Sequence, residues 1–405
     1  MNDHRADTVP TRATKPASPS TAAGPDFRAT AELKLRFAST AASTIEGLDH
    51  LFEGTGQPGV EELRASLRHL LGGDEARGRL EAAEPMQSRL ARVHRLRFSD
   101  GSQTRSFIVK RLEPGIARRN ELVTKRWLPS LGFAGNGPKL IDVAAERGGR
   151  CVWHVYEDFG DWALNVADPD PARVQAVVEL IAQIHIRFAN HPLLAECRLF
   201  GGDLGIHFFD SNVRDAVRGL EALRSPAVEI SAEHLALRDR LLGRMHQLLS
   251  EQPNRARELA DLGGPETLLH GDLWTMNTFV VSTGSGWQAR LIDWDHAGVG
   301  PVIYDLSTFL LRFPPGNRLW ILERYREAVA AAGWCLPTVR DLNLLFETAE
   351  YARFANRIIW PALALLLEGA EWAFDELAEV EQWFKDWRPV LPINNSAGPP
   401  DGLKP

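Results

Sequence analysis

The chain has 405 residues, of which 44% are apolar and 24% charged, and its formal net charge is −7. These values are typical of a globular protein with room for two or three domain-sized units. The acidic balance argues against a nucleic-acid-binding protein, whose surface is normally basic. The three cysteines, Cys151, Cys197 and Cys335, form no C-x-x-C pair, which favours a reducing compartment such as the cytoplasm.

Two features argue against export and membrane insertion. The first residues lack the apolar core of a secretory signal. The best apolar run, Ile358–Leu367, is too short to span a bilayer and contains Pro361. We therefore expect a cytoplasmic protein with no membrane partner.

The N-terminal third changes character along its length. Residues 1–28 are rich in Pro, Ser, Thr and Ala, which predicts a disordered tail. Residues 29–75 have helix-like apolar spacing in places, for example Val60, Leu63 and Leu67, which predicts a helical extension whose role the sequence does not indicate.

Strand patterns begin at about Arg79. Apolar runs at Leu90–Phe98 and Thr104–Leu112 flank Asp100-Gly101, and this arrangement predicts a β-hairpin. A helix is expected next, and then two more strands. These three segments are Ile116–Trp127, Pro138–Val143 and Cys151–Tyr156.

Helical patterns dominate the rest of the chain, at Val174–Phe188, Ala232–Leu249, Trp320–Ala332 and Leu342–Leu367. A sheet-rich part followed by a helical part predicts a two-lobed α+β protein. We expect an N-lobe at 76–157, a C-lobe at 158–392 and a flexible tail at 393–405. The cleft between the lobes is the expected ligand site.

The strongest chemical signal lies between Leu268 and Phe309. His270-Gly271-Asp272 is followed by Asn277, by a predicted hairpin (strands 278–282 and 288–292) and by Asp293. Pairing of the two strands brings Asn277 and Asp293 together, and their oxygen atoms suit Mg²⁺ carrying the phosphates of a nucleotide. Asp272 can then lie beside an acceptor hydroxyl, as phosphoryl transfer requires.

This segment resembles the aminoglycoside phosphotransferase/choline kinase-like family, which has the protein-kinase-like fold. The family patterns H-G-D-x-x-x-x-N, I-D-W and G-x-x-x-x-D-L are matched by His270 to Asn277, Ile292 to Trp294 and Gly300 to Leu306. The resemblance implies that Asp272 is the catalytic aspartate, that Asn277 and Asp293 bind Mg²⁺, and that His270 and Asp305 support the catalytic loop. Asp305 could also act as the N-cap of a helix.

A second set of candidates lies in the predicted N-lobe. Lys110 closes an apolar strand and can reach the phosphates of ATP, while Ile108 on the same face covers the adenine. Glu121, on the following helix, is the expected partner of Lys110. The ordinary alternatives are a lysine at a strand edge and a glutamate on a charged helix face.

Two features depart from protein kinases. No glycine-rich loop precedes Lys110, and Ser88 is the remaining candidate for a phosphate contact. Asp158-Phe159-Gly160 spells the kinase metal motif but precedes the catalytic loop, so it is misplaced for metal binding. We interpret Tyr156, Glu157 and Asp158 instead as the hinge, whose backbone groups would bind adenine.

The acceptor is expected to be small, because no long activation segment and no Ala-Pro-Glu follow Asp293. Its candidate contacts are Trp274, Asp295, His296, Glu350, Tyr351, Arg353 and Trp360. Such an aromatic and acidic lining would suit an amine. Asp295 could instead be a further metal contact or a solvated loop residue, and His296 a polar rim residue. Tyr351 and Trp360 could be core residues of a long helix.

The leading hypothesis is an enzyme that transfers the γ-phosphoryl group of ATP, with Mg²⁺, to a hydroxyl of an aminoglycoside-like, sugar or amino-alcohol acceptor. The alternative is a catalytically inactive kinase-fold module that binds a nucleotide or ligand. A protein kinase is disfavoured by the missing activation segment. The choice between ATP and GTP, the acceptor and the oligomeric state stay open.

Overall fold

The computed structural model describes residues 45–73, 77–86, 92–224, 231–284 and 286–392. The predicted tails at 1–28 and 393–405, and also Ser88, lie outside the described residues. We call residues 45–157 the N-lobe and residues 158–392 the C-lobe.

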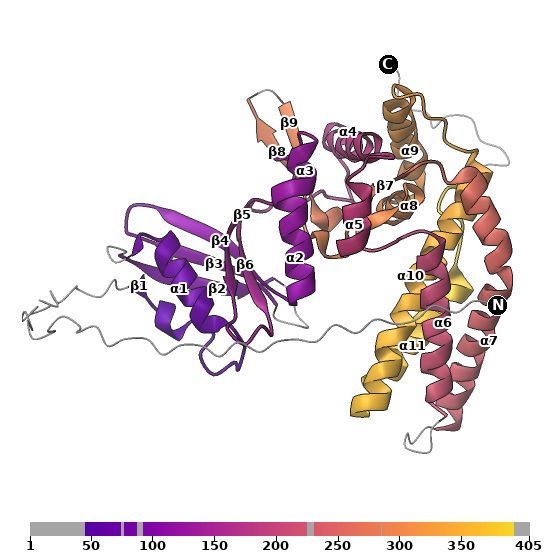
Figure 1. Ribbon diagram of the computed structural model, residues 1–405, viewed down its shortest axis with the longest axis horizontal. Helices are drawn as coiled ribbons and strands as arrows, with labels where there is room; N and C mark the ends of the chain where they lie inside the picture. The colour runs from indigo at the N-terminus through magenta and orange to yellow at the C-terminus, as the bar shows by residue number, and fades with distance from the viewer. Residues whose placement is uncertain (1–44, 74–76, 87–91, 225–230, 285, 393–405) are drawn as a thin grey trace, which may run out of the picture. The chain divides into compact units, whose positions relative to one another are not determined.

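A six-stranded sheet forms the N-lobe, with strand order β1-β2-β3-β4-β6-β5 (Figure 1). Neighbouring strands are antiparallel except β1 and β2, which pair in parallel. Its elements are β1 (Ile45–Glu46), η1 (Leu48–His50), α1 (Val60–Leu70), β2 (Gly78–Pro85), β3 (Val93–Ser99), β4 (Thr104–Leu112), α2 (Pro114–Leu122), the π-helical turn η3 (Val123–Trp127), α3 (Leu128–Ser130), β5 (Leu140–Ala145) and β6 (Val152–Glu157).

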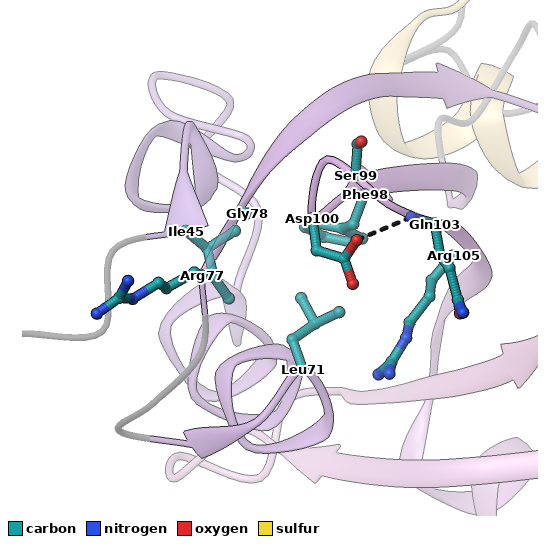
Figure 2. A pocket seen from close by; sticks show the side chains of 9 residues that line it. All are labelled: Ile45, Leu71, Arg77, Gly78, Phe98, Ser99, Asp100, Gln103 and Arg105. Carbon is teal, nitrogen blue, oxygen red and sulfur yellow. Dashed lines mark hydrogen bonds between the residues drawn. The ribbon is translucent and has the colours of Figure 1, made fainter.

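The hairpin predicted at Asp100-Gly101 joins β3 and β4, and Ser99 pairs with Thr104 at its end. Oδ1 of Asp100 accepts hydrogen bonds from the backbone N–H groups of Ser102 and Gln103. A hydrogen bond from the Ser102 hydroxyl, together with these two backbone bonds, lowers the pKa of Asp100 to about 2. The turn borders a cavity of about 40 Å³ at the edge of the sheet (Figure 2). The carboxylate of Asp100 therefore holds the turn.

Strand alternation divides the sheet into two faces. Leu96 and Val109 point to one face, where they share a buried core with Leu63 and Leu67 of α1. The intervening residues of β3 and β4, together with Tyr156 of β6, point to the opposite face and line a cleft; those of β3 and β4 are Val93, Arg95, Ile108 and Lys110. The side chains available for ligand binding are therefore set by strand register.

The helix expected at Ile116–Trp127 is present, but it begins at Pro114 and changes its hydrogen-bonding pattern. Pro114 suits the first helical turn because proline has no N–H to leave unpaired. From Val123 to Trp127 the helix widens into a π-helical turn. Trp127 is fully buried, and its indole N–H donates to Glu196 of the C-lobe at 3.0 Å.

The C-lobe is mainly helical (Figure 1). Its helices are α4 (Pro171–Phe188), α5 (Leu194–Phe200), α6 (Ile206–Ala222), α7 (Ala232–Leu262), α8 (Ile303–Leu311), α9 (Pro315–Ala330), α10 (Val339–Glu368) and α11 (Trp372–Asp386). Two small antiparallel sheets lie between α7 and α8 in the sequence, made of β7 (Glu266–Leu269) with β10 (Gly298–Pro301), and of β8 (Thr278–Thr283) with β9 (Gly286–Leu291). Short 3-10 turns η4 (Thr275–Asn277) and η5 (Trp294–His296) connect them.

Within the described part of the chain, no helix has the length and apolarity that a membrane crossing requires.

Candidate functional site

The His270-Gly271-Asp272 segment leaves β7 in a conformation that requires glycine. Gly271 has φ +81°, and a Cβ at this position would collide with the carbonyl oxygen of His296. The sharp turn directs the chain from the buried strand towards Asp272.

Asp305 anchors this turn from α8. Its two carboxylate oxygens accept the backbone N–H groups of His270 and Gly271, at 2.7 and 2.9 Å. Burial alone would raise the pKa of Asp305, but His185 at 3.4 Å, His270 and these N–H donors lower it overall. Asp305 lies inside α8, whose N-cap is Val302, so the alternative N-cap interpretation is wrong. The supporting geometry expected for Asp305 is present.

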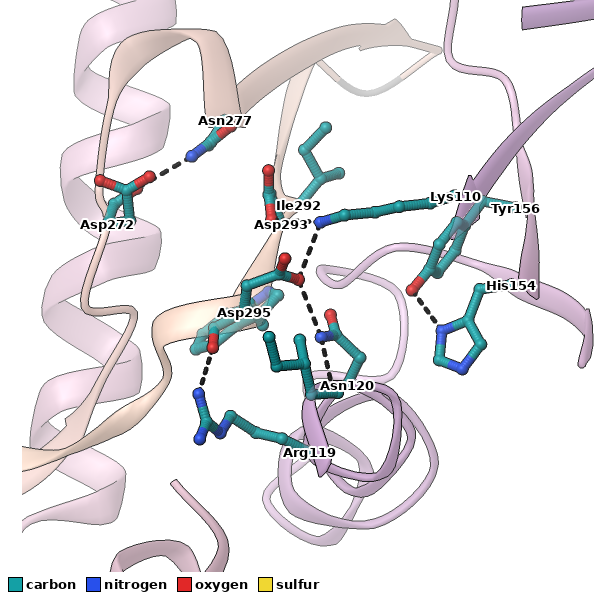
Figure 3. Close-up of polar contacts among 12 residues, drawn as sticks. Lys110, Arg119, Asn120, His154, Tyr156, Asp272, Asn277, Ile292, Asp293 and Asp295 are labelled. Carbon is teal, nitrogen blue, oxygen red and sulfur yellow. Dashed lines mark hydrogen bonds and ion pairs between the residues drawn. The ribbon is translucent and has the colours of Figure 1, made fainter. Parts of the chain in front are cut away.

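Asn277 and Asp293 lie at the same end of the β8–β9 hairpin. Thr278 pairs with Leu291, and the N–H of Ile292 donates to the carbonyl oxygen of Asn277 at 3.0 Å. The amide nitrogen of Asn277 donates to the backbone carbonyl of Asp272 at 2.9 Å (Figure 3). Its amide oxygen is therefore the atom that can face a cation.

His270 joins the turn to the end of the hairpin. Its Nε2 donates to the carbonyl oxygen of Ile292 at 2.8 Å, because a carbonyl can only accept. In the neutral ring Nδ1 is then an acceptor, and it receives the N–H of Asp272 at 3.3 Å. His270 is thus a positioning residue between Asp272 and the segment that carries Asp293.

Lys110 crosses the cleft and binds two carboxylates of the C-lobe. Its Nζ lies 2.6 Å from Asp293 Oδ1 and 2.8 Å from Asp295 Oδ1 (Figure 3). Asn120 of α2 donates to the same oxygen of Asp295 at 2.9 Å. Asp293 itself has φ +63°, a left-handed conformation that aspartate adopts more readily than most residues.

The charged groups in this cluster change one another's pKa values. Burial alone would raise the pKa of Asp293, but the Lys110 ammonium lowers it overall. Burial and the neighbouring Asp293 raise the pKa of Asp295. Burial alone would lower the pKa of Lys110, but the two carboxylates raise it. Burial also raises the pKa of Asp272, although His270 and His296 oppose this shift.

The expected Lys110–Glu121 pair does not form among the described residues. Glu121 binds Lys125 at 3.1 Å and lies 3.9 Å from Nε2 of His154. Lys110 pairs with Asp293 and Asp295 instead, so it is a partly buried residue of the cleft and not a strand-edge lysine. The residue of α2 that reaches this cluster is Asn120, one position before Glu121.

A cleft of about 420 Å³ lies between the lobes. Apolar side chains from both lobes line it, and its inner end carries Lys110, Asn277 and Asp293; the apolar residues include Val93, Ile108, Met276, Phe279 and Ile292. The hinge candidates Tyr156, Glu157 and Asp158 also line it. The hydroxyl of Tyr156 interacts with Nδ1 of His154 at 2.7 Å.

The side chain of Asp158 points to the N-lobe sheet. Its carboxylate accepts the Ser106 hydroxyl at 2.6 Å and pairs with Nε of Arg95 at 2.9 Å. It also accepts the N–H of Gly160 at 2.9 Å. This carboxylate is engaged away from Asp293, in agreement with our rejection of Asp158-Phe159-Gly160 as a metal motif.

The residues predicted to contact the acceptor fall into two groups, and the first lies near Asp272 and α8. Trp274 donates its backbone N–H to the carbonyl of Asp272 at 2.8 Å, and the charge of Arg353 acts on Asp272. Glu350 is buried and binds both Arg353 and the Ser307 hydroxyl, the latter at 2.7 Å.

The other candidates on α10 do not join this group. Tyr351 is buried against Trp383, and its hydroxyl donates to Glu347 at 2.9 Å, so it is a core residue. Trp360 is 71% exposed, so its interpretation as a core residue is wrong, and its contact with an acceptor stays a prediction.

Sequence reasoning missed two residues of the cleft, Arg95 and Asn120, and a third residue, Arg312, that contacts Trp274. Arg95 pairs with Ile108 across the sheet, so strand alternation could have placed it in the cleft. Asn120 lies three positions after the buried Ala117 on α2 and could have been assigned to the inward face. Arg312 carried no sequence signal. Its guanidinium lies 3.7 Å from the centre of the Trp274 ring.

The two-lobed architecture and the residues that line the cleft define a kinase-like fold. Residues 88–342, more than half of the chain, match the phosphotransferase enzyme family. The chain belongs to this family, which confirms the resemblance seen in the sequence.

Solved structures of two aminoglycoside or spectinomycin phosphotransferases agree on the fold. The GDP and kanamycin complex of APH(2")-IIia is 15% identical, with a TM-score of 0.51, and the match covers 80% of this chain and 98% of that one. Spectinomycin phosphotransferase APH(9)-Ia, in complex with ADP and spectinomycin, is 14% identical, with a TM-score of 0.50 and coverages of 82% and 95%. Choline kinase LicA from Streptococcus pneumoniae is 13% identical, with a TM-score of 0.47 and coverages of 81% and 99%. No curated protein sequence matches the chain significantly.

Proposed function

We propose that the chain is an ATP-dependent phosphotransferase that moves the γ-phosphoryl group to a hydroxyl of a small molecule. One observation carries the proposal. Hydrogen bonds through His270 and Asn277 connect Asp272 to the end of the hairpin that bears Asp293, and Lys110 faces that end across the cleft. This is the set of groups that phosphoryl transfer needs, held on rigid elements.

Asp272 would orient the acceptor hydroxyl and accept its proton as the oxygen attacks the γ-phosphorus. Its raised pKa makes it a stronger base than an ordinary aspartate. The backbone around it is fixed by Asp305, so the carboxylate is positioned before the acceptor binds.

The donor set at the hairpin fits Mg²⁺. Among the described residues, no three His, Cys, Asp or Glu side chains form a metal-binding group by themselves. That suits a cation brought by the nucleotide, because Mg²⁺ is usually held by one or two protein oxygens together with phosphates. Asn277 and Asp293 would hold it, and the cationic Lys110 Nζ already lies against Asp293 at 2.6 Å. When bound, Mg²⁺ would neutralise charge on the transferred phosphoryl group.

Lys110 would exchange its carboxylate partners for phosphate oxygens when the nucleotide enters. The apolar side chains of Val93, Ile108 and Phe279 would cover the base, next to the hinge at Tyr156–Asp158. The related structures of APH(2")-IIia and APH(9)-Ia are complexes with GDP and with ADP, which supports a nucleotide in this cleft.

The test is a coupled assay for ADP release by the full chain with Mg-ATP and a panel of sugars, amino alcohols, hydroxy acids and aminoglycosides. We expect release with at least one acceptor, and a loss of at least about 100-fold in Asp272→Asn. That variant should keep the thermal stabilisation by Mg-ATP. Stabilisation without turnover of any acceptor would favour the inactive nucleotide-binding module. Turnover of Asp272→Asn at the wild-type rate would overturn the mechanism.

A further inference from the structure

Two charged residues of α10, Glu350 and Arg353, contact α8, and the charge of Arg353 acts on Asp272. Arg353 donates to the backbone carbonyl of Tyr304 at 3.1 Å, and its guanidinium lies 4.2 Å from the centre of the Tyr304 ring. Arg353 also pairs with Glu350, which accepts the Ser307 hydroxyl. Glu350 is therefore neutralised and satisfied within the protein, so it is poorly suited to bind an amine.

Arg312, the residue that follows α8, has a different environment. Its guanidinium stacks on the indole ring of Trp274, and the Trp274 backbone is hydrogen-bonded to Asp272. Within the described residues, Arg312 has no carboxylate partner. Its Nε is buried there without a hydrogen-bond acceptor.

The indole N–H of Trp274 also lacks a hydrogen-bond partner. Its Nε1 is buried without an acceptor among the described residues. Two stacked side chains thus present unpaired N–H donors, which is costly unless a ligand supplies acceptor oxygens. Arginine is especially suited to bind carboxylate or phosphate, because its planar fork can donate two parallel hydrogen bonds.

The charged side chains around Arg312 also favour a ligand with a carboxylate or phosphate group. The groups that act on it are the carboxylates of Glu350 and Asp272 and the cations of Arg353 and Arg357. Arg353 pairs with Glu350 and Arg357 with Glu379, so among the described residues Arg312 is the arginine of this group that has no carboxylate partner. Burial lowers the pKa of Arg312, and the neighbouring arginines lower it further. A bound anion would relieve both effects.

We propose that Arg312 and the indole N–H of Trp274 bind an oxyanion group, carboxylate or phosphate, on the molecule whose hydroxyl is phosphorylated. This inference rests on the proposed function and narrows its acceptor to hydroxy acids or phosphorylated alcohols. It departs from the amine-bearing acceptor that the sequence suggested. Arg312 and Trp274 are binding residues in this scheme, and Asp272 remains the base.

The experiment compares acceptors matched in their hydroxyl groups: glycerol, glycerate, glycerol 3-phosphate and ethanolamine, and likewise glucose, glucuronate, glucose 6-phosphate and glucosamine. ADP release gives kcat/KM for each with the full chain. We expect an anionic member of at least one series to exceed its neutral and cationic counterparts at least tenfold. The carboxylate and phosphate arms show which oxyanion is bound.

Three variants test whether Arg312 and Trp274 cause the preference for an anionic acceptor. Arg312→Gln should raise the KM for the preferred anionic acceptor at least tenfold, with the KM for ATP unchanged, and Arg312→Lys should restore part of the affinity. Trp274→Phe keeps the ring and removes the N–H, so a smaller rise in KM is expected. Arg324→Gln is the matched control, because Arg324 of α9 is exposed and pairs with Glu327. The control should behave as wild type.

Binding is also measured without turnover, by thermal shift with each compound in the presence of Mg-ADP. Stabilisation by an anionic member that is lost in Arg312→Gln supports the proposal even if no compound is phosphorylated. Preference for neutral or cationic acceptors, an equal effect of Arg312→Gln on all acceptors, or no stabilisation by any anionic member overturns it. A failure of the proposed function is distinct, since ADP release would then be absent with every acceptor and would not depend on the charge of the acceptor or on Arg312.

Discussion

The ammonium of Lys110 lies 2.6 Å from the carboxylate of Asp293, although 183 positions separate the two residues in the chain. The contact joins the N-lobe sheet to the end of the β8–β9 hairpin. It brings the group expected to bind phosphate into direct contact with the group expected to bind the metal.

The first prediction concerns this pair. Lys110→Met should lower kcat/KM for ATP by at least about 30-fold, because it removes the cation proposed to bind the phosphates. It should also destabilise the free protein, since Asp293 and Asp295 would face each other without a cation. Steady-state kinetics and urea denaturation measure the two effects.

The matched control for Lys110→Met is Lys125→Met. Lys125 lies on η3, is half exposed and pairs with Glu121. The Lys125→Met variant should retain the wild-type kcat/KM and nearly the wild-type stability. Equal losses in both variants would contradict a specific role for Lys110.

The second prediction concerns the anchor of the catalytic turn. In Asp305→Asn an amide NH₂ would face a backbone N–H of His270 or Gly271, so one buried donor loses its acceptor. We expect a loss of about 1–3 kcal/mol in the free energy of unfolding. Because the turn positions Asp272, kcat should fall more than the KM for ATP rises. The control is Asp100→Asn. Asp100 also accepts two backbone N–H groups, but in an exposed turn, so this variant should leave kcat unchanged.

The third prediction compares two glycines with nearly the same backbone conformation. Gly271 has φ +81° and Gly101 has φ +86°, but only at Gly271 would a Cβ meet the backbone of His296. Gly101→Ala should cost about 1 kcal/mol, the usual cost of the left-handed conformation. Gly271→Ala should cost at least about 3 kcal/mol and reduce activity. Similar unfolding free energies for the two variants would argue against the packing described for the turn.

The fourth prediction is a dependence of stability on pH. His154 is fully buried, and burial lowers its pKa to about 4, below the ordinary value of 6.5. Between these values the unfolded state binds more protons, so stability falls as pH falls. The shift corresponds to a loss on the order of 3 kcal/mol between pH 6.5 and pH 4.

Urea denaturation across this pH range tests the assignment. His154→Gln should be less stable at pH 7 but should lose less stability on acidification than the wild type. His69→Gln, an exposed substitution on α1, should keep the wild-type slope. If the slope of His154→Gln equals that of the wild type, another group is responsible.

Much of the fold could be predicted because local pattern and tertiary structure agree. The strand at Thr104–Leu112 was predicted with the bounds that the structure gives, since Asp100-Gly101 fixes the turn and apolar residues alternate after it. The hairpin that joins Asn277 to Asp293 was predicted for the same reason. Helices α5, α6 and α11 were missed. In α6 a helical face is buried only through packing on α7 and α10, which the local sequence does not reveal.

The convergence of Asn277 and Asp293 could be predicted because the hairpin between them sets their separation. Asp272, Asn277 and Asp293 are linked by short segments, so few arrangements are available to them. The partner of Lys110 depends on the rotation of α2 about its axis, which packing decides, and Asn120 is presented in place of Glu121. Tyr351 and Trp360 are nine positions apart, which places them on opposite sides of a helix with 3.6 residues per turn. They could not both have lined one pocket.

The segment from Asp272 to Asn277 has a consequence for how the enzyme could change during evolution. On one side it borders the cleft lined by the sheet and the β8–β9 hairpin, and on the other it carries Trp274, which contacts Arg312 beyond α8. If the proposed function holds, substitutions at the end of α8 or on α10 should alter the preferred acceptor and spare the proposed nucleotide cleft. Laboratory selection for a new acceptor should then concentrate its mutations there and leave the nucleotide preference as it was.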